Sequence, residues 1–212
     1  MTSLRQLLGT HAPLLLIDAA SARVQVGLFE ADGTARWQTS EEEAGVGVFC
    51  SIEALDLDLA TVRAFAFCEG PGSVLGVRTT AMAVRACQAL AARPAFAYCS
   101  LAVVAHALGQ RDTTVIADAR RELWHRYSLE AGLRRVPATE LVGKLVMPDG
   151  FRHWSPLPAN VDRTPYLLAD LLARTAKADL FRETDAPDAF LHEEPSYATW
   201  MPQIHRAPAP AP

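Results

Sequence analysis

The sequence from Val62 to Pro94 reads VRAFAFCEGPGSVLGVRTTAMAVRACQALAARP, and its three parts decide the fold. The apolar run Val62–Cys68 is long enough for one buried strand. The alanine-rich end of the stretch is typical of a helix, which Pro94 terminates. Between strand and helix lies a loop that contains Gly70, Pro71, Gly72, Ser73 and Gly76.

This loop is similar to a phosphate-binding turn but matches neither common motif. Ser73 stands at the expected helix N-cap, where its hydroxyl can bind a free backbone N–H, and such a helix start can also bind an anion. However, Val77 and Arg78 follow Gly76 where a P-loop has lysine, and Leu75 replaces the third glycine of a dinucleotide-binding turn. An anion site and a simple tight turn therefore both remain open.

The composition excludes several classes of protein. The 212 residues suffice for one domain or two small lobes, and the net charge of -4 gives no general attraction to nucleic acid or anionic lipid. Scattered cysteines and dispersed histidines predict neither a disulfide framework nor a metal site. We expect no signal peptide, no membrane span, a cytoplasmic location, and a disordered Pro/Ala tail at residues 202–212.

The same order of elements is predicted twice along the chain. The first set comprises strands at Leu14–Ala19, Val24–Glu30 and Ala35–Thr39, a helix ending at Leu55, the strand Val62–Cys68 with its helix, the strand Ala95–Cys99 and a helix at Ser100–Leu108. The second set comprises strands at Thr113–Asp118, Glu122–Leu129 and Arg134–Val136, a weak helix at Thr139–Leu145, a strand at Phe151–Trp154, and a helix from Thr164 and Pro165 to Lys177.

Local sequence supports a duplication, because LLIDA at Leu15–Ala19 aligns with VIADA at Val115–Ala119. A repeated βββαβα unit with aspartate ending its first strand is the plan of the actin-like ATPase (ribonuclease H-like) α/β fold. We expect a first lobe at residues 13–99 and a second, reduced lobe at residues 100–201.

Five stretches, in this order and spacing, resemble the TsaB (YeaZ) family: LLLIDAAS, EGPGSVLGVRTTAMAVRACQALA, SLAVVAHAL, DARRELWHRYS and EEPSYATW. The specific part is Gly-Pro-Gly-Ser-x-x-Gly-Val-Arg at Gly70–Arg78, and the likeness extends from about Leu14 to Met201. The chain departs from the family at Ala19 and Ala20, where Thr-Ser is usual, and at Val74 and Leu75, where Phe-Thr is usual. Its first-lobe helix also lacks the usual His-Ser start and Leu-Leu-Pro end.

The resemblance implies a non-catalytic subunit, without cofactor, of the machinery that makes threonylcarbamoyladenosine in tRNA. It implies a TsaD-like enzyme as partner and a TsaE-like ATPase in the complex. We expect contact with tRNA only through partners, and a homodimer when the chain is alone, because a second copy would cover the apolar partner surface. Two alternatives remain: an ATPase or small-molecule kinase of the same fold, and a metallopeptidase of the glycoprotease type.

Asp18 and Asp118 occupy the positions where an active member of this fold holds a hydrated metal near phosphates. Such a site needs small residues beside each aspartate, yet Arg120 and Arg121 follow Asp118. We therefore predict no catalytic residue and no bound metal. The glycine loop and vestigial nucleotide site would comprise Asp18, Ser21, Gly70, Pro71, Gly72, Ser73, Gly76, Arg78, Asp118, Arg120 and Arg121.

The first-lobe helices are the predicted partner surface. Arg78 lies near a helix start, where the dipole disfavours a cation, so a carboxylate such as Asp18 or Glu69 is its expected partner unless it reaches solvent. The exposed ridge between the helices at Ala44–Leu55 and Val74–Ala92 is expected to contain Val48, Ile52, Val77, Ala81, Val84 and Gln88.

Overall fold

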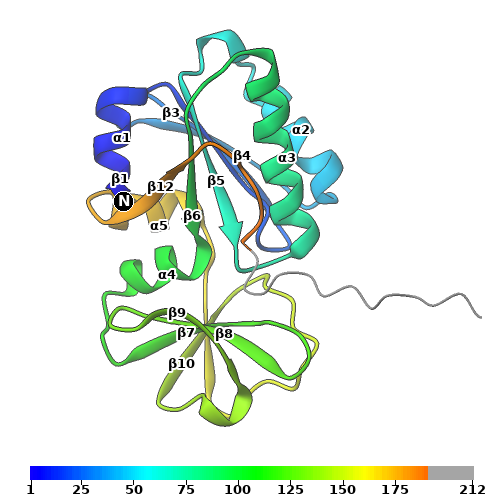
Figure 1. The fold of residues 1–212 in the computed structure, drawn as a ribbon, viewed down its shortest axis with the longest axis vertical. Helices are drawn as coiled ribbons and strands as arrows, with labels where there is room; N and C mark the ends of the chain where they lie inside the picture. Colours follow the sequence, from blue (N-terminus) through cyan, green and yellow to red (C-terminus); the bar gives the residue numbers. More distant parts are fainter. Residues whose placement is uncertain (191–212) are drawn as a thin grey trace, which may run out of the picture.

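The computed structural model describes residues 1–190 and contains two β-sheets, one in each lobe (Figure 1). The first sheet has seven strands in the order β1-β12-β6-β5-β2-β3-β4. Five of its strands are β2 (Leu14–Asp18), β3 (Val24–Phe29), β4 (Ala35–Ser40), β5 (Ala64–Gly70) and β6 (Ala95–Cys99). β2, β5 and β6 run parallel, whereas β3 and β4 form an antiparallel meander beside β2.

The second sheet repeats this arrangement with five strands in the order β11-β10-β7-β8-β9. They are β7 (Thr113–Asp118), β8 (Leu123–Ser128), β9 (Gly132–Pro137), β10 (Lys144–Pro148) and β11 (Val161–Thr164). Strand for strand, the order and direction match those of β6-β5-β2-β3-β4 in the first sheet. The predicted actin-like α/β fold with a duplicated unit is therefore confirmed.

Helices cover the two sheets unequally. α2 (Ala44–Ala54) and α3 (Val74–Leu90) lie side by side on one face of the first sheet, and α4 (Ser100–Leu108) lies between the two sheets (Figure 1). α5 (Leu168–Thr175) packs on α4, and α1 (Leu4–His11) precedes the first unit. Where the first lobe has α2, the second lobe has only the short 3-10 helix η2 (Ala138–Glu140). A second 3-10 helix, η1 (Leu59–Thr61), precedes β5 in the first lobe. The second lobe is reduced, as predicted.

The core has two parts, one on each face of the first sheet. Leu15 and Ile17 of β2 pack with α2 and α3, while Leu14 and Leu16 pack on the opposite side, toward α1, α4 and the second lobe. Successive side chains of a strand point to opposite faces. A strand buried on both faces must therefore be apolar throughout, which explains the uninterrupted LLLI run of β2.

Several predicted elements differ from the structure. The segment Thr139–Leu145 forms only η2, and Phe151–Trp154 is irregular because β11 lies later in the chain. The last helix begins at Leu168 because Thr164 is paired with Pro148 in the sheet. Helix α1, with a capping box between Ser3 and Gln6, was not predicted.

The predicted boundary of the second lobe is also wrong in part. β12 (Asp179–Thr184) returns to the first sheet, where it pairs antiparallel with β6, and β1 (Thr2–Ser3) pairs with β12. The first sheet is thus extended by segments from both ends of the described chain. The predicted tail at residues 202–212 lies outside the described residues.

Candidate functional site: the cleft between the lobes

The glycine loop after β5 packs directly on the loop that follows β2. Ser73 caps α3 by accepting a hydrogen bond from Gly76 N at 3.2 Å, and its own N–H donates to Ala20 O at 2.7 Å. A Cβ atom at Gly76 would lie 1.8 Å from Ala19 O, and one at Gly72 would lie 2.4 Å from Ala20 O. The glycines are thus required for close contact between two backbone segments.

Asp18, at the end of β2, is completely buried and its carboxylate is held by three donors. The hydroxyls of Tyr98 and Tyr166 donate to Oδ2 at 2.6 and 2.8 Å, and Ala20 N donates to Oδ1 at 2.9 Å. Burial is the largest influence on the pKa of Asp18 and raises it, although the hydrogen bonds from Tyr98, Ala20 and Tyr166 oppose this shift. The carboxylate that would face a hydrated metal is therefore hydrogen-bonded to two tyrosine hydroxyls instead.

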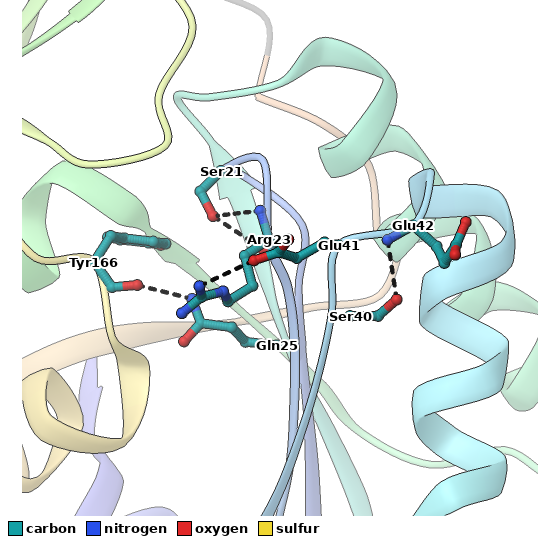
Figure 2. A network of polar contacts seen from close by, with 7 residues as sticks. All are labelled: Ser21, Arg23, Gln25, Ser40, Glu41, Glu42 and Tyr166. Carbon is teal, nitrogen blue, oxygen red and sulfur yellow. Dashed lines mark hydrogen bonds and ion pairs between the residues drawn. The ribbon is translucent and has the colours of Figure 1, made fainter.

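Tyr166 is itself fixed by the first lobe. The side-chain amide of Gln25, on β3, donates to Tyr166 O at 3.0 Å and accepts from Leu168 N at 2.9 Å. Figure 2 shows Gln25 reaching the backbone of Tyr166. The Tyr166 ring also packs edge-on against Phe151, with centroids 5.0 Å apart. Tyr166 thus closes the site beside Asp18 from the second half of the chain.

Asp118, the equivalent residue in the second lobe, has different surroundings. Its carboxylate accepts hydrogen bonds from the backbone N–H groups of Arg120, Trp154 and Ser155, at 2.5, 2.7 and 2.7 Å. Desolvation raises the pKa of Asp118, but the bonds from Ser155, Arg120 and Trp154 outweigh it and the net pKa is lowered. Asp118 therefore stays ionised and anchors the loop between β10 and β11.

The turn after Asp118 has no glycine, yet Arg120, Arg121 and Glu122 adopt positive φ angles of 62°, 54° and 62°. The guanidinium of Arg120 lies over the ring of Trp154, 4.3 Å from its centroid. This turn is built from bulky charged residues in a conformation that side chains disfavour. It is unlike the small-residue hairpin that lets a phosphate approach the backbone.

Two adjoining pockets lie beside the buried carboxylate of Asp18 and the glycine loop. One has a volume of about 200 Å³ between Ala20, Ser73 and Glu42, and the other of about 610 Å³ between Tyr166 and Asp149. Both are lined by Ser21, Ala22, Glu41, Gly150 and Arg152. Ala22 N donates to Gly150 O at 2.8 Å, which links the lobes there.

At the rim of the pockets, Arg23 forms an ion pair with Glu41 at 3.2 Å (Figure 2). Ser21 accepts a hydrogen bond from Arg23 N and donates to Arg23 O, so its hydroxyl stabilises the turn between β2 and β3. At this rim the charges of Arg23 and Glu41 are therefore engaged with each other.

The expected ion pair of Arg78 is not formed with either named carboxylate. Asp18 binds the two tyrosines, and Glu69 accepts from Arg182 at 2.7 Å. Arg78 is exposed, which corresponds to the alternative that its side chain reaches solvent. It therefore lies on the surface of α3 and outside the cleft.

The predicted ridge between the first-lobe helices is wrong. Val48, Val77, Ala81 and Val84 are buried against the sheet, whereas Ile52 and Gln88 are only partly buried. The large apolar residues that these helices expose are other residues of the same helices. They are Val46 and Phe49 on α2, and Val74, Leu75, Met82 and Leu90 on α3.

Some features of the site were not found from the sequence. Tyr98 lies next to the end of β6, two strands from β2, and this sheet order offered a signal for its contact with Asp18. Tyr166, Gln25 and Trp154 carried no sequence signal. Within residues 1–190, no group of three or more His, Cys, Asp or Glu side chains could hold a metal ion. Among the helices of that range, none has the length and apolar character needed to cross a membrane.

Comparison with known proteins identifies the fold. No family model matches the chain, and no curated protein matches it significantly. An uncharacterized protein from Pseudomonas aeruginosa with similarity to peptidase YEAZ is 21% identical, with a TM-score of 0.56, over 82% of this chain and 90% of that one. YeaZ from Pseudomonas aeruginosa is also 21% identical, with a TM-score of 0.56, over 76% of this chain and 89% of its own. The chain therefore has the fold of these YeaZ proteins, the fold that its sequence motifs predicted.

Proposed function

We propose that this chain is a non-catalytic subunit of the TsaB (YeaZ) type, which binds and supports a TsaD-like enzyme in threonylcarbamoyladenosine modification of tRNA. In this role it acts in the cytoplasm, and a TsaE-like ATPase joins the complex. The motif at Gly70–Arg78 and the shared fold with two YeaZ structures support the proposal.

The apolar surface of α2 and α3 is the observation that carries the proposal. Phe49 is 53% exposed on α2, while Leu75 and Met82 are 67% and 59% exposed on α3. The two helices lie side by side (Figure 1), and each carries exposed apolar side chains. Large apolar side chains exposed together are typical of the centre of a protein interface. We name this surface, formed by Val46, Phe49, Val74, Leu75 and Met82, the helix face.

The contacts that close the cleft around Asp18 favour a non-catalytic role for this chain and argue against ATP hydrolysis. The carboxylate of Asp18 is sealed by Tyr98 and Tyr166, and the glycine loop packs against Ala19 and Ala20 rather than leaving its amides open. A nucleotide would have to displace these contacts before its phosphates could reach Asp18. We therefore expect no turnover of ATP by the isolated chain above a blank reaction. Activity that disappears in Asp18→Asn would favour the ATPase alternative.

The decisive experiment uses the double variant Leu75→Glu/Met82→Glu. Both positions are exposed, so the chain should fold, but two carboxylates buried at an interface without partners should weaken association by at least 100-fold. Binding to the TsaD-like protein of the same cell would be measured by calorimetry. Self-association of the chain alone, measured by light scattering, should weaken too if a second copy covers this face.

The matched control is Val142→Glu, which places the same charge at an exposed apolar position of the second lobe. It should bind the TsaD-like protein like wild type. If Leu75→Glu/Met82→Glu folds and binds as tightly as the control, the helix face is not the docking surface. If wild type itself shows no binding, the proposed function is wrong.

A further inference from the structure

Two arginines face each other on the second sheet. β8 and β9 pair antiparallel, with Arg126 directly opposite Arg134. Next along the same face is the pair Trp124 and Val136, because side chains alternate along each strand. The intervening residues of β8 point the other way, toward α4, as shown by the contact of Tyr127 with His106 at 6.4 Å between centroids. Arg126 and Arg134 thus lie on the face turned away from α4.

These two charges are not neutralised within the described part of the chain. Neither Arg126 nor Arg134 has a carboxylate within ion-pair distance there, and the buried Nε of Arg126 has no hydrogen-bond partner. Like charges placed directly opposite in a sheet are unfavourable. By contrast, arginines of the first sheet and its helices do form ion pairs, namely Arg23 with Glu41, Arg85 with Asp188 and Arg182 with Glu69.

Beyond the buried pair Trp124 and Val136, at the start of β8, lies the turn between β7 and β8. Asp118 is the register partner of Trp124, and it anchors the backbone of Trp154 at 2.7 Å. Arg120 lies over one side of the Trp154 ring, which is nevertheless 55% exposed. Arg121 is exposed in the same turn. We name Arg120, Arg121, Arg126, Arg134 and Trp154 the arginine face.

We propose that the arginine face binds a single-stranded segment of RNA. Guanidinium groups bind phosphates through paired N–H donors, and an exposed indole offers a surface on which an unpaired base can stack. The net charge of -4 gives no general attraction, so binding depends on this local cluster. The surface chemistry fits any single strand; the choice of RNA rests on the proposed function. The expectation that RNA is contacted only through partners is then replaced by a direct contact.

The test is fluorescence anisotropy of the isolated protein with a labelled 15-nucleotide RNA of mixed sequence, at several salt concentrations. Arg126→Gln/Arg134→Gln should weaken binding at least tenfold. If each arginine contacts one phosphate, the slope of log affinity against log salt should fall by about 1.4. Trp154→Ala should weaken binding about tenfold with little change in slope, because it removes stacking and no charge.

The control is Arg63→Gln/Arg174→Gln, which removes two exposed positive charges far from this face. If this control weakens binding as much as Arg126→Gln/Arg134→Gln, only net charge matters and the proposal fails. It also fails if wild type does not bind, or if Trp154→Ala has no effect, which would mean that no base stacks on the indole. Should the double variant unfold, Arg121→Gln in the exposed turn tests the same surface.

The two proposals can fail separately. Leu75→Glu/Met82→Glu should retain RNA binding, since its substitutions lie on the helix face of the first lobe. Loss of RNA binding in Arg126→Gln/Arg134→Gln, with unchanged affinity for the TsaD-like protein, would assign the two surfaces to different partners.

Discussion

The hydroxyl of Tyr166 donates a hydrogen bond to the carboxylate of Asp18 at 2.8 Å, although 148 positions separate the two residues. Asp18 ends the first strand of the first lobe, and Tyr166 lies between β11 and α5. The residue that would serve a nucleotide site in this fold is used here to hold the two halves of the chain together.

Asp18→Asn is expected to change how stability depends on pH. Burial, opposed by hydrogen bonds from Tyr98, Ala20 and Tyr166, raises the pKa of Asp18 above 3.8 in the folded state. The folded state then binds this proton more tightly than the unfolded state does. The contribution of Asp18 is therefore fully present below about pH 3.8 and is lost as pH rises through the folded-state pKa. Wild type should lose stability relative to Asp18→Asn over this range, as measured by urea denaturation.

Asp118→Asn provides a control of opposite sign. Desolvation raises the folded-state pKa of Asp118, but hydrogen bonds from the backbone N–H groups of Ser155, Arg120 and Trp154 outweigh it. The folded-state pKa is therefore below 3.8. Its contribution should be present above about pH 3.8 and should disappear as pH falls through the lowered pKa. The same direction of change in both variants would contradict these assignments.

Gly76→Ala should destabilise the protein strongly. The added Cβ would lie 1.8 Å from Ala19 O, a backbone atom, so the two loops would have to separate. We expect a loss of about 3 kcal/mol or more, at the upper end for an overpacked core. In Gly45→Ala the new methyl group meets nothing within 4 Å, and removing a helical glycine should stabilise by about 0.5–1 kcal/mol. Equal thermal unfolding temperatures for the two variants would refute this explanation of the glycine loop.

Much of the fold was predictable because its signals are local. Buried strands such as Leu14–Asp18 are continuous apolar runs, and the repeat of LLIDA in VIADA indicated the second unit. By contrast, β12 carries the polar sequence DLFRET, and its pairing with β6 depends on a contact distant in sequence. The seal on Asp18 has the same origin, since Tyr166 stands in a segment without periodic pattern.

The orientation of α3 could not be predicted because the helix is apolar or small on all sides. Val77, Ala81 and Val84 face the sheet, while Leu75, Met82 and Ala86 face outward, and both sets follow helical spacing. Burial in the folded chain decides between them. The sequence therefore predicted both helices, but it assigned to the proposed partner surface side chains that are mostly buried in the structure.

Ala81→Glu should unfold the protein, and Ala86→Glu should not. Ala81 is 2% exposed and packs in the core under α3, where a carboxylate would lose its hydration without gaining a partner. Ala86 is exposed one and a half turns along the same helix, so the same substitution there should change stability by less than about 0.5 kcal/mol. Circular dichroism on heating would separate the two. A folded Ala81→Glu protein would mean that this side of α3 is not packed as described.

Gln25→Leu should release the start of α5 from the first lobe. Helix α5 has no side-chain cap of its own, and the amide oxygen of Gln25 accepts from Leu168 N while its nitrogen donates to Tyr166 O. Leucine has similar size but neither group, so a buried N–H and a buried carbonyl would each lose a partner. At about 1–3 kcal/mol for each such group, we expect a loss of roughly 2–6 kcal/mol.

Gln38→Leu is the matched control for this last substitution. Gln38 also lies in the first sheet and donates to Ala54 O at 3.3 Å, but in an exposed setting where water can replace the lost bond. Its loss should be less than about 1 kcal/mol. Hydrogen exchange gives the sharper measurement, because the Leu168 amide should exchange much faster in Gln25→Leu while the amides of β2 stay protected. If the Leu168 amide stays protected, α5 is held by its apolar contacts with α4, and the bond from Tyr166 to Asp18 does not depend on Gln25.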